Sequence, residues 1–101
     1  VIGIDTAPKR LQMAAAHGAT HVLEMDVHGA AEAIAEITRG DNADIVFDMT
    51  GHPAVFAGAL KLLRRFGKLI LIGDAGTPSE QSLTSDVIKR DLQIIAAHGG
   101  L

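Results

Sequence analysis

Apolar and polar residues alternate along this chain in blocks that predict strands and helices in turn. Short apolar runs, typical of buried strands, occupy residues 1–5, 21–25, 43–49, 67–73 and 92–97. Apolar residues recur at helical spacing over residues 8–17, 29–39 and 53–65, and a short helix is expected over 83–89. Strands that alternate with helices of this length predict a parallel sheet with helices on both faces, which is an α/β fold.

Two of these segments carry more specific expectations. Pro53 opens the third helix, and Arg64 and Arg65 fall in its predicted last turn, where positive charge suits the negative end of the helix dipole. Residues 43–49, ADIVFDM, are almost continuously apolar, which predicts a strand covered on both faces.

The predicted sheet brings several polar segments to one edge. Ligands of parallel sheets bind beyond the carboxyl ends of the strands. Asp5, the segment MTGH at 49–52 and the segment IGDAG at 72–76 all follow or end predicted strands. The architecture therefore places them on one rim, which is the candidate binding edge.

Asp5 has two interpretations. A strand that ends on an acid, as VIGID does, matches the second strand of dinucleotide-binding folds, where the carboxylate accepts hydrogen bonds from the adenosine ribose. Such a carboxylate also repels a 2′-phosphate, which favours NAD over NADP. Alternatively, Asp5 caps the helix that begins near Pro8, and Arg10 is either a partner of the cofactor or a solvated helix residue.

The amino-acid composition excludes several classes of protein function. Of 101 residues, 48% are apolar and 21% charged, as in a globular domain or part of one. A net charge of −3 and only three aromatic residues give no reason to expect nucleic-acid or anionic-membrane partners. No apolar run approaches the roughly 20 residues of a membrane span. Because cysteine is absent, a disulfide scaffold and a thiolate metal site are excluded within this segment, and we expect a cytoplasmic protein.

No metal site or catalytic residue is assigned from this segment. None of the five histidines, at 17, 21, 28, 52 and 98, forms a ligand cluster with an acid. Asp44 and Asp48 point to the same side of one strand but are not expected to be a catalytic pair. Solvation at the strand end explains Asp44, and hydrogen bonding to a helix or loop could hold Asp48.

Four phrases, in order, resemble the nucleotide-binding domain of the zinc-type alcohol dehydrogenases, the medium-chain dehydrogenase/reductase superfamily. They are VIGIDTAPKRLQMAAAHGATHVL, ADIVFDMTGHPAVFAGALKLLR, GKLILIG and IIAAHGG, and the resemblance covers residues 1–100. DMTG is most similar to the polyol and threonine dehydrogenase branch. RRFGK departs from the Pro-Gly-Gly turn that is usual in the family.

The resemblance implies a Rossmann-type doubly wound sheet without its first strand and glycine-rich loop. Residues 1–101 would then be a partial dinucleotide-binding domain, strands 2 to 6, with the catalytic domain absent from this chain. In the strand order 3-2-1-4-5-6, loss of strand 1 separates strands 3-2 from strands 4-5-6. Because two interior edges would lack partners, we expect this segment to belong to a longer chain and not to fold natively alone.

The resemblance also implies roles for individual residues. Asp5 would hold the adenosine ribose, assisted by Arg10. The adenine and ribose edge would be lined by Met49, Thr50 and His52. The nicotinamide would lie along Ile72, Gly73 and Asp74, with His98 approaching from the last strand. Asp74 stands where the family often has an apolar residue.

The implied function is an NAD-dependent oxidoreductase that moves hydride between a small alcohol or polyol and nicotinamide. NADP is the less expected cofactor, and a zinc ion would belong to the absent catalytic domain. A non-enzymatic nucleotide-sensing module and a methyltransferase are alternatives, although methyltransferase sheets usually finish with an antiparallel hairpin. The last strand, LQIIAA, is too apolar to face water as an edge strand. The resemblance implies that this edge pairs across a two-fold axis in a homodimer or tetramer, with loop 77–88 helping to cover the contact.

Overall fold

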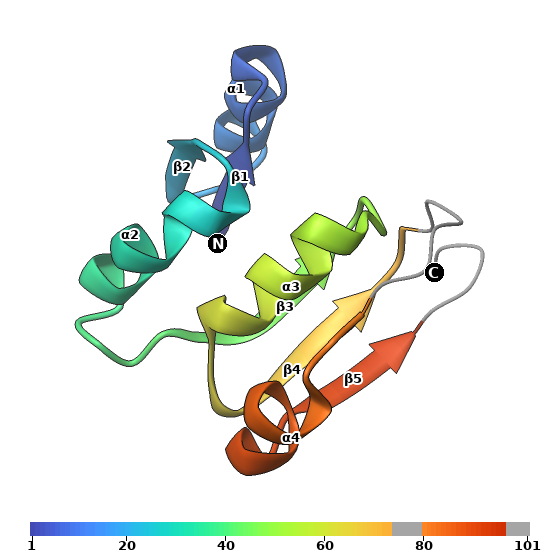
Figure 1. Ribbon diagram of the computed structural model, residues 1–101. Helices are drawn as coiled ribbons and strands as arrows, with labels where there is room; N and C mark the ends of the chain where they lie inside the picture. The colour runs from blue at the N-terminus through green and yellow to red at the C-terminus, as the bar shows by residue number, and fades with distance from the viewer. Residues whose placement is uncertain (74–79, 97–101) are drawn as a thin grey trace.

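The computed structural model describes residues 1–73 and 80–96, in which strands and helices alternate as the sequence predicts (Figure 1). The strands are β1 (Ile2–Asp5), β2 (His21–Glu24), β3 (Ala43–Asp48), β4 (Leu63–Leu71) and β5 (Gln93–Ala96). The α-helices are α1 (Pro8–Ala16), α2 (Ala30–Ile37), α3 (Pro53–Leu62) and α4 (Leu83–Asp86), and two short 3₁₀ turns are η1 (Val27–Gly29) and η2 (Ile88–Arg90).

The strands form two parallel sheets. β1 pairs with β2, and β3, β4 and β5 pair in that order, all in parallel. The α/β fold class with parallel sheets is therefore confirmed, and the strands group in the pair and the trio that the doubly wound order predicts. Among the described residues, β1 and β3 each have a strand partner on one side only.

Helices cover both faces of the first sheet. Gly3 lies under α1, where an added Cβ would be 3.4 Å from the Cβ of Ala14. Because strand side chains alternate between faces, the residues on either side of Gly3 point the opposite way. That face packs against α2, in a cluster that contains Ile2, Ile4, Leu23, Ala30 and Ile34.

Side chains, rather than strand pairing, join the two sheets. Leu62 of α3 is buried together with Ala30 and Ile34 of α2. Ile2 and Ile4 reach this cluster from the first sheet, and Ala43 and Val46 reach it from the second. This cluster is the junction core.

The second sheet is covered on one face within the described residues. α3 lies across β3 and β4, and its Leu60 is buried with Leu63 and Leu69 (Figure 1). Ile45 and Phe47 point to the opposite face and are 49% and 57% exposed. The expectation that this strand is covered on both faces is therefore wrong for the part of the chain that the structure describes.

The third helix is shorter than predicted, ending at Leu62. Leu63 is extended (φ −84°, ψ 143°), is buried in the core and pairs with Ala43. Arg64 and Arg65 consequently lie in β4 rather than in a last helical turn, so their predicted interaction with the helix dipole is wrong. Arg64 forms an ion pair with Asp44, and Arg65 forms one with Asp91. These partners are distant in the sequence, so local patterns do not predict them.

The RRFGK segment forms an irregular bend in β4. Phe66 has a φ of +66°, and the register of β4 against β3 shifts between Ala43 and Ile45. The predicted helix over 83–89 is divided into α4 and η2. In the parts of the chain that are described, no helix has the length and apolar character that crossing a membrane requires.

Candidate cofactor-binding site

Asp5 ends β1 at the predicted rim and forms a bidentate ion pair with Arg10. Arg10 donates from Nε to Oδ2 at 2.6 Å and from Nη2 to Oδ1 at 2.8 Å. The Ala7 N–H donates to Oδ1 at 3.0 Å. The N-cap position of α1 is Ala7, with no side-chain cap bond, so Asp5 organises the turn before the helix rather than occupying its N-cap.

This arrangement keeps the Asp5 carboxyl ionised at neutral pH. The Arg10 guanidinium, and next the Ala7 N–H, hold the pKa of Asp5 well below its usual range. A carboxylate offers about four acceptor positions, and the three donors occupy three of them. One position on Oδ2 is therefore left for a further donor, such as a ribose hydroxyl.

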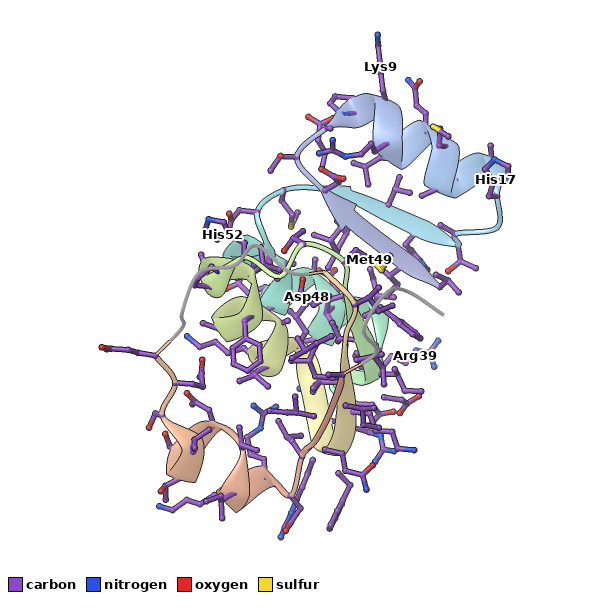
Figure 2. The ribbon with its side chains drawn as sticks, turned by 90° about the vertical axis from the view of Figure 1, so that its right-hand side faces the viewer. Lys9, His17, Arg39, Asp48, Met49 and His52 are labelled. Atoms are coloured by element: carbon purple, nitrogen blue, oxygen red, sulfur yellow. The ribbon has the colours of Figure 1, made fainter. Side chains whose placement is uncertain are left out.

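A second group of rim residues surrounds the turn from β3 into α3. The Oδ1 atom of Asp48 accepts three hydrogen bonds, from Thr50 N (2.9 Å), Thr50 Oγ1 (3.0 Å) and Gly51 N (3.1 Å). Gly51 has a φ of +66°, a conformation that glycine adopts at little cost. Met49 and His52 lie on opposite sides of Asp48 (Figure 2).

His52 is the N-cap of α3. Its Nδ1 accepts a hydrogen bond from Ala54 N at 3.2 Å, and its own N–H donates to Thr50 Oγ1 at 3.1 Å. Each polar side chain from Asp48 to His52 thus accepts a bond from the backbone two residues further on. Local bonding of this kind fixes the path of loop 49–52.

The residues that follow β4 are hydrogen-bonded to Asp48, directly before the same loop. Ile72 N and Gly73 N both donate to the Asp48 carbonyl, at 3.0 and 3.1 Å. A Cβ at residue 73 would be 2.6 Å from the carbonyl carbon of Thr50 and closer still to Met49. Only glycine therefore fits where this strand end meets loop 49–52.

The structure thus brings the predicted residues together in two groups. Asp5 pairs with Arg10. Gly73 packs against loop 49–52, and both Ile72 and Gly73 bond to Asp48 directly before that loop. Asp74 and His98 were also predicted to bind cofactor, and both lie outside the described residues.

Asp48 was anticipated only as a loop-bonded residue, and that expectation is confirmed. An acid that ends a buried strand directly before Thr-Gly is a recognisable signal for such a turn. Asp44, by contrast, has a side chain that is 77% exposed, and it binds Arg64 at the amino end of β3.

The chemistry of the rim suits a polyhydroxylated ligand better than a metal ion. Within residues 1–73 and 80–96, no three His, Asp or Glu side chains gather as a metal-binding group. The rim presents an ionised carboxylate with an acceptor position left, a cationic guanidinium and closely packed backbone. These groups fit the ribose hydroxyls and the backbone-lined path of a dinucleotide.

Comparisons with known proteins agree with this arrangement. The sequence profile of the family described as "Zinc-binding dehydrogenase" matches residues 1–101. The chain belongs to this family. An L-threonine 3-dehydrogenase of Symbiobacterium thermophilum is 35% identical over 92 residues, covering 91% of this chain and 26% of that protein. The sorbitol dehydrogenase of Bacillus subtilis is 34% identical over 87 residues, covering 86% and 24%.

A solved structure of a relative has the same fold. The alcohol dehydrogenase of Thermotoga maritima superposes with a TM-score of 0.86 at 29% identity, over 95% of this chain and 28% of that one. The predicted superfamily is confirmed. The chain spans about a quarter of the length of the curated relatives it matches.

Proposed function

We propose that this chain is the NAD-binding portion of a zinc-type alcohol or polyol dehydrogenase-like oxidoreductase. The observation that carries the proposal is the Asp5 carboxylate, which stands at the carboxyl end of β1 with an acceptor position left beyond its bonds to Arg10 and Ala7. Membership of the zinc-binding dehydrogenase family supports it. A carboxylate at this position favours NAD over NADP, because it accepts bonds from ribose hydroxyls and repels a 2′-phosphate.

The residues of this chain bind and orient the cofactor. Asp5 accepts the ribose hydroxyls, and Arg10 holds the carboxylate in place. Loop 49–52, with Met49, Thr50 and His52, lines the adenine and ribose edge. When bound, NAD supplies the acceptor for a substrate hydride.

The nicotinamide half lies along the end of β4 in this proposal. Ile72 and Gly73 present closely packed backbone there, and we include Asp74 and His98 as further contacts. No residue of this segment is assigned to the chemical step. A zinc ion, where the protein uses one, would be held by residues outside the described part, which presents no ligand set for it.

The proposal extends to the whole protein. Residues 1–101 would be a partial dinucleotide-binding domain, and a separate catalytic domain in the same polypeptide would hold a small alcohol or polyol. The exposed β5, residues Gln93–Ala96, would pair across a two-fold axis in a homodimer or tetramer. We propose a cytoplasmic location, in keeping with a sequence that contains no cysteine.

The test is binding and turnover by the full-length protein. Calorimetric titration with NAD and NADP should give tighter binding of NAD. Appearance of NADH absorbance with a panel of alcohols and polyols should then identify turnover. Absence of NAD binding would overturn the proposal, and NAD binding without turnover of any alcohol would favour the nucleotide-sensing alternative.

A further inference from the structure

We propose that Asp48 is a positioning residue that locks loop 49–52 against the strand end at Ile72 and Gly73. The two ends of the cofactor site, adenosine and nicotinamide, would then be held as one unit. This inference rests on the proposed NAD-binding function.

The side chain of Asp48 is organised entirely by its own loop. The residue is 2% exposed and is the only polar or charged residue that is buried within the described part of the chain. Three donors from Thr50 and Gly51 converge on Oδ1, and Oδ2 is buried without a partner among the described residues. A buried carboxylate requires such bonds to offset its desolvation, so loop and side chain depend on each other.

The main chain of Asp48 faces the other half of the site. Its carbonyl oxygen accepts the N–H groups of Ile72 and Gly73, at 3.0 and 3.1 Å. One residue therefore bonds to the loop through its side chain and to the strand end through its backbone. A displacement of either segment is transmitted through Asp48 to the other.

Close packing strengthens this connection. Gly73 lies so near the backbone of Met49 and Thr50 that a single added methyl group has no room. Because the contact is between backbones, no side-chain rotation can relieve an intrusion. An added methyl group at residue 73 must therefore push loop 49–52 outward, although residue 73 belongs to the nicotinamide end.

The test compares binding of NAD with binding of ADP-ribose, which is NAD without its nicotinamide ring. In the full-length protein, Gly73→Ala should weaken ADP-ribose binding by about ten-fold, which corresponds to about 1.4 kcal/mol. Asp48→Ala should weaken both ligands at least as much. Asp48→Asn should recover most of the loss, since an amide oxygen can replace Oδ1 as acceptor.

Two further measurements isolate the coupling. Asp44→Ala, on the same strand but exposed, is the matched control and should leave both affinities unchanged. In a double-mutant cycle, the effects of Asp48→Ala and Gly73→Ala on NAD binding should be non-additive, because both act on one loop.

Several results would overturn the inference. An ADP-ribose affinity that Gly73→Ala leaves within about two-fold of wild type, or strictly additive effects in the cycle, would mean that the two ends are independent. If Asp48→Ala does not fold, the ADP-ribose affinity of Gly73→Ala still decides between coupled and independent ends. Failure of the wild type to bind NAD refutes the proposed function and this inference together, whereas NAD binding that is insensitive to these variants refutes only the inference.

Discussion

Replacement of Asp5 by serine should convert the cofactor preference of the full-length protein. The substitution removes a carboxylate that accepts bonds from Ala7 and Arg10 and leaves the guanidinium of Arg10 without its partner. Two effects follow, because the ribose hydroxyls lose their acceptor and the repulsion of a 2′-phosphate disappears. The Lys9 side chain extends outward from α1, so Arg10 is the better placed cation to meet that phosphate (Figure 2).

The size of the effect follows from the acceptor positions on Asp5. With three of about four occupied, two ribose hydroxyls cannot both bind unless Arg10 yields one of its bonds. A hydrogen bond to a charged group contributes about 1.5–3 kcal/mol. One ribose hydroxyl takes the vacant position, and the second only replaces a bond from Arg10, so it adds little. Loss of Asp5 should therefore cost NAD binding an amount close to the lower figure, which raises the KM for NAD by about ten-fold.

The assay is the ratio of kcat/KM for NAD and NADP. Asp5→Ser should lower the NAD value by about ten-fold and raise the NADP value. The double variant Asp5→Ser/Arg10→Ala should keep the NAD loss but not the NADP gain, because no guanidinium remains for the 2′-phosphate. Asp44→Ser breaks a comparable ion pair with Arg64, at the amino end of β3, and should change neither value. A ratio unchanged by Asp5→Ser would refute the ribose-binding role.

Three further predictions concern the segment, the assembly and acid stability. The 101-residue chain alone contains no G-x-G sequence to bind the pyrophosphate, and within its described residues β1 and β3 are each paired on one side only. Calorimetry on this segment should therefore detect no NAD binding, and a micromolar dissociation constant would contradict this prediction. Light scattering of the full-length protein should give a dimer or tetramer, because the β5 edge is exposed, and a monomer at micromolar concentration would argue against pairing at that edge. Because Arg10 lowers the pKa of folded Asp5, their pairing contributes stability above about pH 4 and loses it at lower pH. Urea unfolding of wild type and Asp5→Asn should therefore show a small, constant difference that shrinks only below that pH, and a difference that closes near neutral pH would contradict the ion pair.

Much of the fold could be predicted because the governing signals are local. The alternation of apolar strands and amphipathic helices determines the order of elements, and an acid at the end of VIGID identifies the rim. Leu63 shows where local signals stop. The run KLLRR continues a helical pattern to residue 65, but Leu63 is buried and pairs with Ala43, so the helix ends at Leu62.

The bonds that support this ending are long-range. Arg64 binds a residue 20 positions away, and Arg65 binds one 26 positions away. Neither partner can be inferred from helical spacing. Asp48 is the corresponding case in the candidate site, because its turn is readable from the sequence but its bonds to Ile72 and Gly73 depend on the pairing of β3 with β4.

The junction core has a consequence for how the two halves of the rim are aligned. Asp5 stands on the first sheet and loop 49–52 on the second, and within the described residues the sheets share no strand pairing. Apolar contacts through Leu62 and its neighbours set the spacing of the halves, and such contacts lack the directionality of backbone hydrogen bonds. The volume of the side chain at position 62 therefore helps to set the distance between Asp5 and loop 49–52. A change there would alter the distance that a bound dinucleotide has to span while leaving every residue that we propose to contact it intact.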